Sequence, residues 1–390
     1  MKRTVMVLVD FKRAFDTVWK VGLLHKLLAL EIPSCYIKWI KQFLSDRQGR
    51  VSYGVAKSGY KKFHEGLPQG SVLSPTLFLC FINDITDKLP PNCEVSLFAD
   101  DLALWTQSSD IDEAESSMQK ALDVLENWSK KWKLEINVEK TEVTYFSNDN
   151  QEAKHQPYLE LFGEVLNYNP YPRFLGVTFD RQLTFNGHID ILVKKVKTRL
   201  KIMQTLKGKT WGQNRSDLRI VYLTYIRSCI DYCCAAWAPS TSKTSLDKLE
   251  TVQNSAARII TQCTKTTQTD ALLTEANLLP LKDRMKELGA IAFEKSLRLP
   301  PENPRRKVAE MEGPPKRLKR GNWRDSSTKT ITEAKLDNLP RQELQQPLIQ
   351  HNLTTTTFGE ELNQKIKHSD DNEAKRKAAK EHWSHYHNQQ

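Results

Sequence analysis

The sequence predicts an α+β fold in which an antiparallel sheet carries helices on one face, followed by an all-helical region and a disordered basic tail. Runs of β-branched and aromatic residues alternate with leucine-rich helical patterns in the first half of the 390-residue chain. Their order (strand, helix, hairpin, helix, strand) does not follow the regular alternation of a doubly wound parallel sheet. From about residue 186 only helical patterns remain, and they end near residue 299. We therefore divide the chain into residues 1–185, 186–299 and a low-complexity segment, 300–390.

The first region contains the elements of the predicted sheet. TVMVLVD at residues 4–10 is a β-branched apolar run of the kind that is buried on both faces of a sheet. Leucines at helical spacing predict a helix over residues 20–31, which Pro33 ends. The other predicted elements are hairpins across residues 47–62 and 94–106, helices at 74–85 and 111–132, and strands at 141–147 and 173–180.

The composition indicates a folded protein that handles a polyanion. Lysine and arginine total 58 against 47 acidic residues, a formal net charge of +11, which is typical of nucleic-acid-binding proteins but also of many others. After residue 300 apolar residues are too few to offset the entropy of ordering the chain. No stretch approaches the roughly 20 apolar residues of a membrane-spanning helix. We expect no membrane partner and an intracellular location, in the nucleus, the cytoplasm or both.

Two acidic sites and a glycine-containing loop carry the strongest chemical signal. Asp10 ends the first predicted strand, Asp100 and Asp101 lie at the tip of the second predicted hairpin, and EGLPQGS lies between them along the chain. Clustered carboxylates can hold the two divalent ions, about 4 Å apart, that assist phosphoryl transfer. Singly, an Asp pair is usually a solvated turn and a strand-terminal Asp is often a helix cap. Jointly, the three parts favour a nucleotidyl-transfer site.

These motifs resemble those of a known family. VDFKRAFDTV resembles the first catalytic motif of the reverse transcriptases of non-LTR retrotransposons, GLPQGSVLSPTLF resembles the second, and FADD resembles their metal-binding turn. The similarity is to the jockey-like, LINE-type group and continues through WKLEINVEKTEV and FLGVTFD to PSTSKTSLDKLETVQNSAARII. It implies a polymerase palm with partial fingers, followed by a thumb-like or connection-like helical region. The implied activity is RNA-directed DNA synthesis from an RNA template, a DNA primer and deoxynucleoside triphosphates.

The resemblance also implies roles for residues of the first and third motifs. Asp10 and Asp100 would hold two Mg²⁺ ions, for which Mn²⁺ can substitute, and Asp101 would complete the acidic pair. Phe15 would lie under the sugar of the incoming nucleotide and block a 2′-hydroxyl, although an ordinary core aromatic fits KRAFD equally well. We assign no metal role to Asp16. Its side chain could cap the following helix or pair with a lysine.

The same similarity implicates further residues in nucleotide and primer binding. Gln69 and Gly70 would lie against the incoming nucleotide and template, while a plain helix-initiating loop would explain the same motif. Lys140 would lie near the triphosphate and protonate the pyrophosphate, although a lone lysine is more often a solvated charge. The residues that resemble a primer grip, with an ordinary strand as the alternative, are Phe174, Leu175 and Gly176.

Basic residues of the helical region suit a template-primer duplex. Nine lysines and arginines face two acids between Asp190 and Arg219, although a solvated helix face has the same pattern. The predicted phosphate contacts are Lys194, Lys195, Lys197, Arg199 and Lys201. Two later clusters, Arg305–Lys307 and Lys316–Arg320, resemble a bipartite nuclear-import signal.

The chain starts at the first palm strand, so we expect an N-terminally truncated enzyme that lacks the upstream fingers motifs and their cationic triphosphate contacts. Losing such contacts removes stabilisation of the transition-state charge. This leaves a second hypothesis, a catalytically inactive nucleic-acid-binding remnant of a decayed retroelement. The two hypotheses differ in whether the catalytic aspartates are needed for primer extension.

Overall fold

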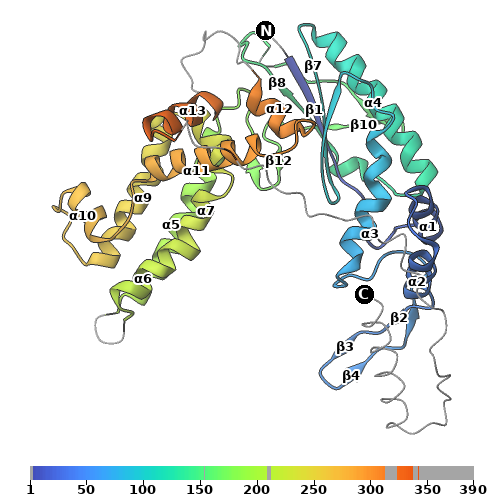
Figure 1. Ribbon diagram of the computed structural model, residues 1–390, viewed down its shortest axis with the longest axis horizontal. Coiled ribbons are helices and arrows are strands. Elements are labelled where there is room, and N and C mark those ends of the chain that lie inside the picture. Colours follow the sequence, from blue (N-terminus) through green and yellow to red (C-terminus); the bar gives the residue numbers. More distant parts are fainter. Residues whose placement is uncertain (1–2, 153, 209–211, 312–322, 337–340, 342–390) are drawn as a thin grey trace.

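The protein consists of two bodies, one built around a five-stranded sheet and one built of helices (Figure 1). The computed structural model describes residues 3–152, 154–208, 212–311, 323–336 and 341. Each body has its own apolar core: one cluster of buried side chains lies within residues 5–166 and another within residues 177–285. The mixed α+β fold predicted from the sequence is therefore confirmed.

The central sheet has the strand order β11-β8-β1-β7-β6. β1 (Arg3–Val9) lies in the middle and runs antiparallel to both β7 (Asp101–Ser108) and β8 (Glu142–Phe146), and β6 (Cys93–Phe98) completes a hairpin with β7. The short edge strand β11 (Asn167–Tyr168) is parallel to β8. The sheet is antiparallel, as predicted, except at this edge.

Burial along β1 alternates instead of being complete. Val5, Val7 and Val9 are buried, whereas the residues between them are only half-buried. The prediction of a strand buried on both faces was therefore wrong. The reason is that helices cover one face, and the other face at Leu8 borders a cavity. A continuous apolar run cannot by itself distinguish these two environments.

The helices of the first body pack beside this sheet. They are α1 (Lys20–Ala29), α2 (Ser34–Leu44), α3 (Leu73–Ile82) with the 3₁₀ turn η1 (Asn83–Thr86), and α4 (Ile111–Trp132). α4 crosses β1 and β7. Its first turn is capped by Asp110, whose side chain accepts a hydrogen bond from the backbone N–H of Asp112, and Lys133 ends it in a left-handed conformation.

Four two-stranded ladders, arranged in three hairpins, project from or border this body. The predicted hairpin across residues 47–62 is formed by β2 (Gln48–Gly49) with β5 (Lys61–Lys62) and by β3 (Ser52–Tyr53) with β4 (Ala56–Lys57). A second one pairs β9 (Glu160–Leu161) with β10 (Glu164–Val165). Instead of the single strand predicted at 173–180, β12 (Arg173–Phe174) and β13 (Val177–Thr178) form a tight hairpin. Its turn requires positive φ values of 45° and 82° at Leu175 and Gly176.

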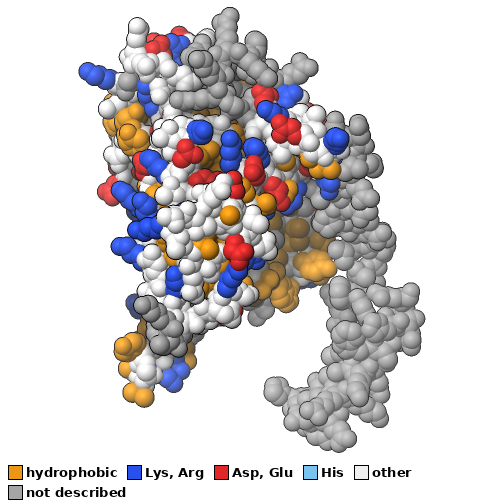
Figure 2. All heavy atoms as spheres, turned by 90° about the vertical axis from the view of Figure 1, so that its left-hand side faces the viewer, with side chains coloured by type: hydrophobic (Ala, Val, Ile, Leu, Met, Phe, Trp, Pro, Cys, Tyr) orange, Lys and Arg blue, Asp and Glu red, His pale blue; other side chains and the backbone are white. Residues whose placement is uncertain are grey.

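The second body is helical. Figure 2 looks onto it and shows Lys and Arg side chains gathered along one edge of its surface. Its core already includes Val177 and Phe185, so the hairpin β12–β13 packs with the helices although we assigned it to the first region. The helical elements are α5 (Asn186–Leu206), α6 (Arg215–Val221), the π-helical turn η3 (Tyr222–Arg227), α7 (Ser228–Asp231), α8 (Cys234–Trp237), η4 (Ala238–Ser240), α9 (Lys243–Thr261), α10 (Thr269–Glu275) and α11 (Leu281–Leu297).

Parts of the predicted tail are ordered against α11. α12 (Pro304–Glu310) and α13 (Trp323–Glu333) bury Ala309 and Ile331 beside Phe293. Disorder from residue 300 onward was therefore wrong for these two segments, because a few well-placed apolar side chains suffice when a neighbouring helix offers a surface. Lys316–Arg320 and most of the remaining tail lie outside the described residues. In the described part of the chain, no helix is both long and apolar enough to cross a membrane.

Candidate active site at the end of the central strand

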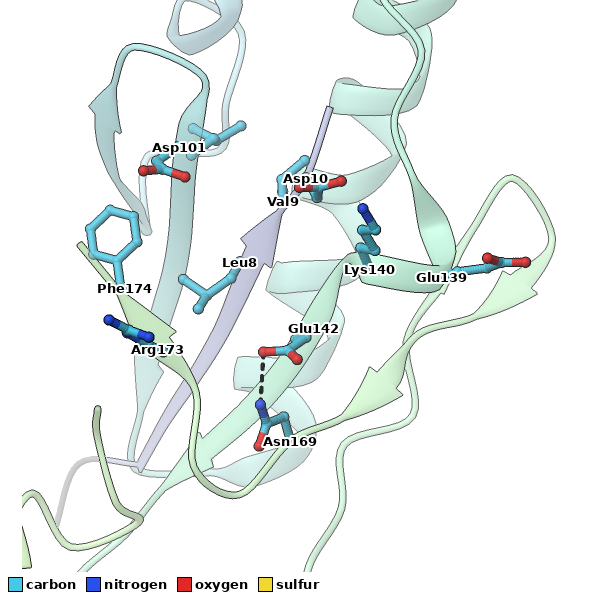
Figure 3. A pocket seen from close by; sticks show the side chains of 11 residues that line it. Leu8, Val9, Asp10, Asp101, Glu139, Lys140, Glu142, Asn169, Arg173 and Phe174 are labelled. Carbon is cyan, nitrogen blue, oxygen red and sulfur yellow. Dashed lines mark hydrogen bonds between the residues drawn. The ribbon is translucent and has the colours of Figure 1, made fainter. Parts of the chain in front are cut away.

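A cavity of about 480 Å³ lies where β1 ends and β7 begins (Figure 3). Its lining combines two carboxylates with two cationic side chains from different elements. Asp10 and Asp101 come from the adjoining ends of β1 and β7, and Lys140 comes from the 3₁₀ turn η2 (Val138–Lys140). Arg173 and Phe174 come from the β12–β13 hairpin, which lies across from Lys140 and brings Phe174 beside Asp101. The cavity is thus lined by segments that are more than 160 residues apart in sequence.

The register of the sheet brings the two carboxylates together. Val9 pairs with Leu102 in the antiparallel ladder, so one further step places Asp10 opposite Asp101. The backbone of Asp10 is held on both sides: its N–H donates to Thr141 Oγ1 at 3.3 Å, and its carbonyl accepts from Asn137 N–H at 2.7 Å. The position of Asp10 therefore depends on backbone pairing rather than on its own side chain.

The acidic pair is electrostatically strained. Partial burial, together with the negative charges of Asp100 and Asp10, raises the pKa of Asp101 above its ordinary value. Like charges disfavour ionisation of a neighbouring carboxylate, and a cation between them would relieve the repulsion. This is the electrostatic state expected of carboxylates that serve a metal ion.

Asp100 lies at the tip of the hairpin, as predicted, but outside the cavity lining. It is exposed in the two-residue turn between β6 and β7, beside Ala99, whose φ of 54° is unusual for a residue with a Cβ. The residues lining the cavity include Asp101 but not Asp100. Throughout the residues that the structure describes, no three His, Cys, Asp or Glu side chains gather closely enough to form a complete metal site.

The donor set nevertheless fits Mg²⁺. Magnesium prefers oxygen ligands and is commonly held by one or two carboxylates, with water and substrate phosphates completing its shell. Asp10 and Asp101 offer such a pair beside a cavity with room for phosphates. The observation that favours a cation here is the raised pKa of Asp101, to which burial contributes most and the charges of Asp100 and Asp10 contribute further.

Two cations border the cavity from opposite sides. Lys140 is exposed and accessible from the cavity. Arg173, which sequence reasoning missed, stands across from it beside Phe174 (Figure 3). Its only sequence signal was a basic residue directly before FLG. Below them, Asn169 donates a hydrogen bond of 2.8 Å to Glu142, which ties the β11 edge to β8.

The predicted primer-grip residues separate at the turn of their hairpin. Phe174 lines the cavity with the carboxylates, whereas Leu175 and Gly176 line a second cavity of about 450 Å³ against α5 and α7. The Tyr232 hydroxyl donates to the Leu175 carbonyl at 2.9 Å. The hairpin therefore connects the carboxylate cavity to the helical body.

Phe15 and the GLPQGS loop form a neighbouring unit that does not line the cavity. The Phe15 ring stacks on Phe78 with 4.4 Å between ring centroids, which agrees with its reading as a core aromatic. The Leu67 N–H donates to the Phe15 carbonyl at 2.8 Å. Gln69 is exposed, and its side-chain amide donates to Asp16 Oδ1 at 2.9 Å.

Gly66 explains how closely this loop approaches the first motif. Its φ is 83°, and a Cβ there would lie 2.3 Å from the Asp16 carbonyl oxygen. Only glycine fits such a contact without displacing backbone. Gly70 also has a positive φ, 86°, but nothing lies within 4 Å of the Cβ that it lacks. The loop is therefore fixed at Gly66 and open at Gly70.

The basic residues predicted on α5 have three kinds of surroundings. Lys194, Lys197 and Lys201 are exposed at spacings of three and four residues, which puts them on adjacent turns of one side. Lys195 is exposed and borders the second cavity. Arg199 instead packs over the Tyr225 ring at 4.3 Å and donates to the Tyr225 carbonyl, so it is engaged within the helical body.

One known family matches the first region of the chain. Residues 1–179 match the family described as reverse transcriptase (RNA-dependent DNA polymerase). This match spans both carboxylates, the GLPQGS loop and the β12–β13 hairpin. This first region is therefore similar to a reverse transcriptase domain, as the sequence motifs predicted.

Its relatives are encoded by non-LTR mobile elements of insects. The RNA-directed DNA polymerase from mobile element jockey of Drosophila melanogaster is 31% identical over 261 residues, which cover 65% of this chain and 28% of the relative. The probable polymerases from transposon BS and transposon X-element of the same species are 28% and 25% identical, covering 72% and 83% of this chain and 31% and 35% of the relatives. The chain thus spans about a third of the length of these proteins.

Two solved structures of telomerase in complex with a fragment of telomeric RNA also align. The protein from Candida albicans is 14% identical with a TM-score of 0.27, covering 74% of this chain and 47% of that chain. The protein from Candida tropicalis is 12% identical with a TM-score of 0.32, covering 71% and 49%. At these TM-scores, the two structural alignments add nothing to the similarity found in the sequence.

Proposed function

We propose that this chain is the catalytic part of an RNA-directed DNA polymerase of a non-LTR retrotransposon, which adds deoxynucleotides to a primer 3′-hydroxyl. The observation that carries the proposal is the sheet register, because it sets Asp10 opposite Asp101 beside a cavity that Lys140 and Arg173 also line. Carboxylates for cations and cations for phosphates are the two kinds of group that nucleotidyl transfer needs.

Two Mg²⁺ ions, replaceable by Mn²⁺, are the cofactors of this proposal. Reverse transcriptases use divalent metal ions, and Asp10 and Asp101 are the residues that would hold them, with Asp100 joining from the turn. When bound, the ions would supply Lewis-acid activation of the 3′-hydroxyl and neutralise phosphate charge. The protein contributes a pair of carboxylates whose backbone is already fixed, so little reorganisation is needed at the moment of reaction.

The two cations of the cavity have separate proposed roles. Lys140 Nζ would contact the triphosphate and give a proton to the leaving pyrophosphate. Arg173 presents a planar guanidinium that can bind a phosphate through two N–H groups. Because Arg173 belongs to the same hairpin as Phe174, Leu175 and Gly176, we propose that it contacts the primer backbone while that hairpin supports the primer end.

The Phe15 and GLPQGS unit would bind the incoming nucleotide. The Phe15 ring, held against Phe78, would exclude a 2′-hydroxyl and so favour deoxynucleotides. Gln69 and Gly70 would contact the nucleotide and the template base. Asp16 has a positioning role here, because its carboxylate accepts from the Gln69 amide and so orients that side chain.

The helical body would bind the template-primer duplex through its basic surface. Lys194, Lys195, Lys197 and Lys201 would contact phosphates of either strand, with Arg199 bracing the helix from within. RNA template, DNA primer and deoxynucleoside triphosphates are the partners of this proposal. A location in the nucleus or the cytoplasm follows from those partners.

Primer extension on a primed RNA template with Mg²⁺ tests the proposal. We expect Asp10→Asn and Asp101→Asn each to lower the extension rate by about a thousandfold or more, because each removes a preorganised charge at the reacting centre. Asp87→Asn is the matched control, since Asp87 is an exposed carboxylate outside the cavity. Undiminished extension by the Asp10→Asn protein would refute the assignment.

A nucleic-acid-binding protein without catalysis is the second candidate function. The observation that favours it is that, among the described residues, the acids do not form a three-residue metal cluster. It predicts salt-sensitive binding of a template-primer duplex by the unmodified chain and no extension. Extension that the two aspartate substitutions abolish would exclude it.

A further inference from the structure

The β2–β5 hairpin carries a surface that the reaction at the carboxylates does not use. We call residues 47–63 the basic hairpin. Its two short ladders, β2 with β5 and β3 with β4, extend away from the central sheet (Figure 1). None of its residues belongs to the fully buried core of the first body. The side chains at its tip therefore contribute little to the stability of the sheet.

Large apolar side chains are unusually exposed on the basic hairpin. The exposed fractions are 72% for Val51, 88% for Tyr53, 102% for Val55 and 63% for Tyr60. A single exposed apolar residue is ordinary, but a contiguous set on one short hairpin indicates a binding surface. Two tyrosines in this set offer flat rings to a partner.

The charge of the basic hairpin selects the chemistry of that partner. Residues 47–63 contain five lysines and arginines and no acidic residue. Within the described part of the chain, no carboxylate lies within ion-pair distance of any of them. The five cations are Arg47, Arg50, Lys57, Lys61 and Lys62. Uncompensated positive charge beside exposed rings fits single-stranded nucleic acid, whose phosphates and bases bind such groups together.

Two rings are already arranged with guanidinium groups. The Arg50 guanidinium lies over the Tyr60 ring at 4.8 Å, and that of Arg47 lies over the Phe63 ring at 5.5 Å. An arginine that stacks on a ring presents both a planar face for a base and N–H groups for a phosphate. The side chains are thereby partly ordered before a ligand binds, which lowers the entropic cost of binding.

The base of the basic hairpin is attached to the candidate nucleotide-binding loop. The Arg47 guanidinium donates to the Gly66 carbonyl at 2.9 Å, and Lys20 Nζ donates to the Phe63 carbonyl at 2.9 Å. Gly66 begins the GLPQGS loop that contains Gln69. The basic hairpin is therefore joined directly to the loop that contains Gln69.

We propose that the basic hairpin binds the unpaired template strand ahead of the primer end, with Tyr53 and Tyr60 stacking on bases. The proposal rests on the proposed function for the identity of the strand. The absence of acidic residues across 47–63 disfavours a basic protein partner, and the stacked arginines favour bases over a lipid surface.

Fluorescence anisotropy with the full chain and no metal tests this proposal. The probes are a blunt RNA–DNA duplex and the same duplex with a 5′ RNA overhang of about 12 nucleotides, within the range that single-strand sites cover. We expect the overhang to tighten binding about tenfold or more, and Tyr53→Ala with Tyr60→Ala to remove that gain without changing the affinity for the blunt duplex. Lys57→Ala, Lys61→Ala and Lys62→Ala together should lower the salt dependence of overhang binding by about two charges.

Two controls match the tyrosine variant. Tyr53→Phe with Tyr60→Phe keeps the rings and should keep the overhang gain. Tyr158→Ala removes a tyrosine of similar exposure, 65%, that hydrogen-bonds to Glu160, and should also keep it.

The outcomes separate this proposal from its rivals and from the proposed function. An overhang gain that survives the double alanine substitution would overturn it, as would equal losses for blunt and overhanging duplexes. A changed oligomeric state with the gain intact would show a protein interface instead. Because binding is measured without metal, a chain that fails to extend primers can still display the overhang effect.

Discussion

Lysines in the two bodies of this protein include two opposite extremes of environment. In the sheet body, Lys26 is buried: its Nζ lies 3.8 Å from the centre of the Trp132 ring and 2.5 Å from Asp84 Oδ1. In the helical body, Lys194, Lys197 and Lys201 point into solvent. The first arrangement fixes a scaffold, whereas the second leaves charge available to a polyanion. The difference shows that burial decides whether the charge of a lysine is used within the fold or remains accessible to a ligand.

Buried polar groups strengthen the contrast. The helical body encloses neutral and paired groups, such as the Tyr222 hydroxyl, which donates to Gln253 Oε1 at 2.7 Å. Burial raises the pKa of Asp231 there, and Arg227 and Arg284 oppose that rise from 3.5 Å. The sheet body instead leaves its acidic pair at the edge of a cavity. Asp231 thus has two arginine partners, whereas Asp101 has no ion-pair partner in the described part of the chain.

The largest effect that we expect in this comparison comes from the GLPQGS loop of the sheet body. Gly66→Ala should lower the free energy of unfolding by about 4 kcal/mol, because positive φ and a clash with backbone add. Gly70→Ala, at a similar φ without a clash, should cost only about 1 kcal/mol. Urea denaturation measures both. Equal costs would mean that the contact of Gly66 with Asp16 is not a constraint.

The buried lysine should make stability depend on pH. Burial lowers the pKa of Lys26 to about 8, below its ordinary 10.5. Between these values the unfolded chain binds more protons than the folded one, so this group makes the fold more stable as pH rises through that window. We expect the free energy of unfolding of the unmodified protein, relative to Lys26→Met, to increase by about 3 kcal/mol from pH 8 to 10.5.

Lys131→Met is the control for this measurement. Lys131 lies over the same Trp132 ring at 4.9 Å but is exposed. The free energy of unfolding of Lys131→Met should change with pH in the same way as that of the unmodified protein. If the free energy of unfolding of the unmodified protein relative to Lys26→Met did not change with pH, Lys26 would not be buried in solution.

The smallest effect concerns the basic surface of the helical body. Lys194→Ala, Lys197→Ala and Lys201→Ala should each weaken duplex binding about threefold, and together they should reduce the salt dependence by about three charges. Lys286→Ala is the control, because Lys286 already pairs with Asp283 at 3.1 Å. If the control weakens binding as much as each α5 variant does, only net charge matters and α5 is not the duplex surface.

Local patterns predicted much of the fold because they are properties of neighbouring residues. The helix at 111–132 begins and ends as predicted, since its apolar spacing and its Asp110 cap are both local. The prediction of a single strand at 173–180 was wrong, because the turn at Leu175 and Gly176 depends on a contact with Tyr232, which directly follows α7 and is distant in sequence. The prediction of a disordered tail was wrong in part for a similar reason: α11, an earlier element, supplies the surface against which α12 and α13 pack.

By itself, the sequence determined the order of the elements, the motifs and the family, because these follow from local periodicity and from residue types at short spacings. Only the tertiary structure decided which side chains share the cavity. It placed Asp101 but not Asp100 in the cavity lining, added Arg173 to that lining and engaged Arg199 inside the helical body. These choices depend on strand register and on helix packing, where one residue of displacement turns a side chain from a cavity to solvent.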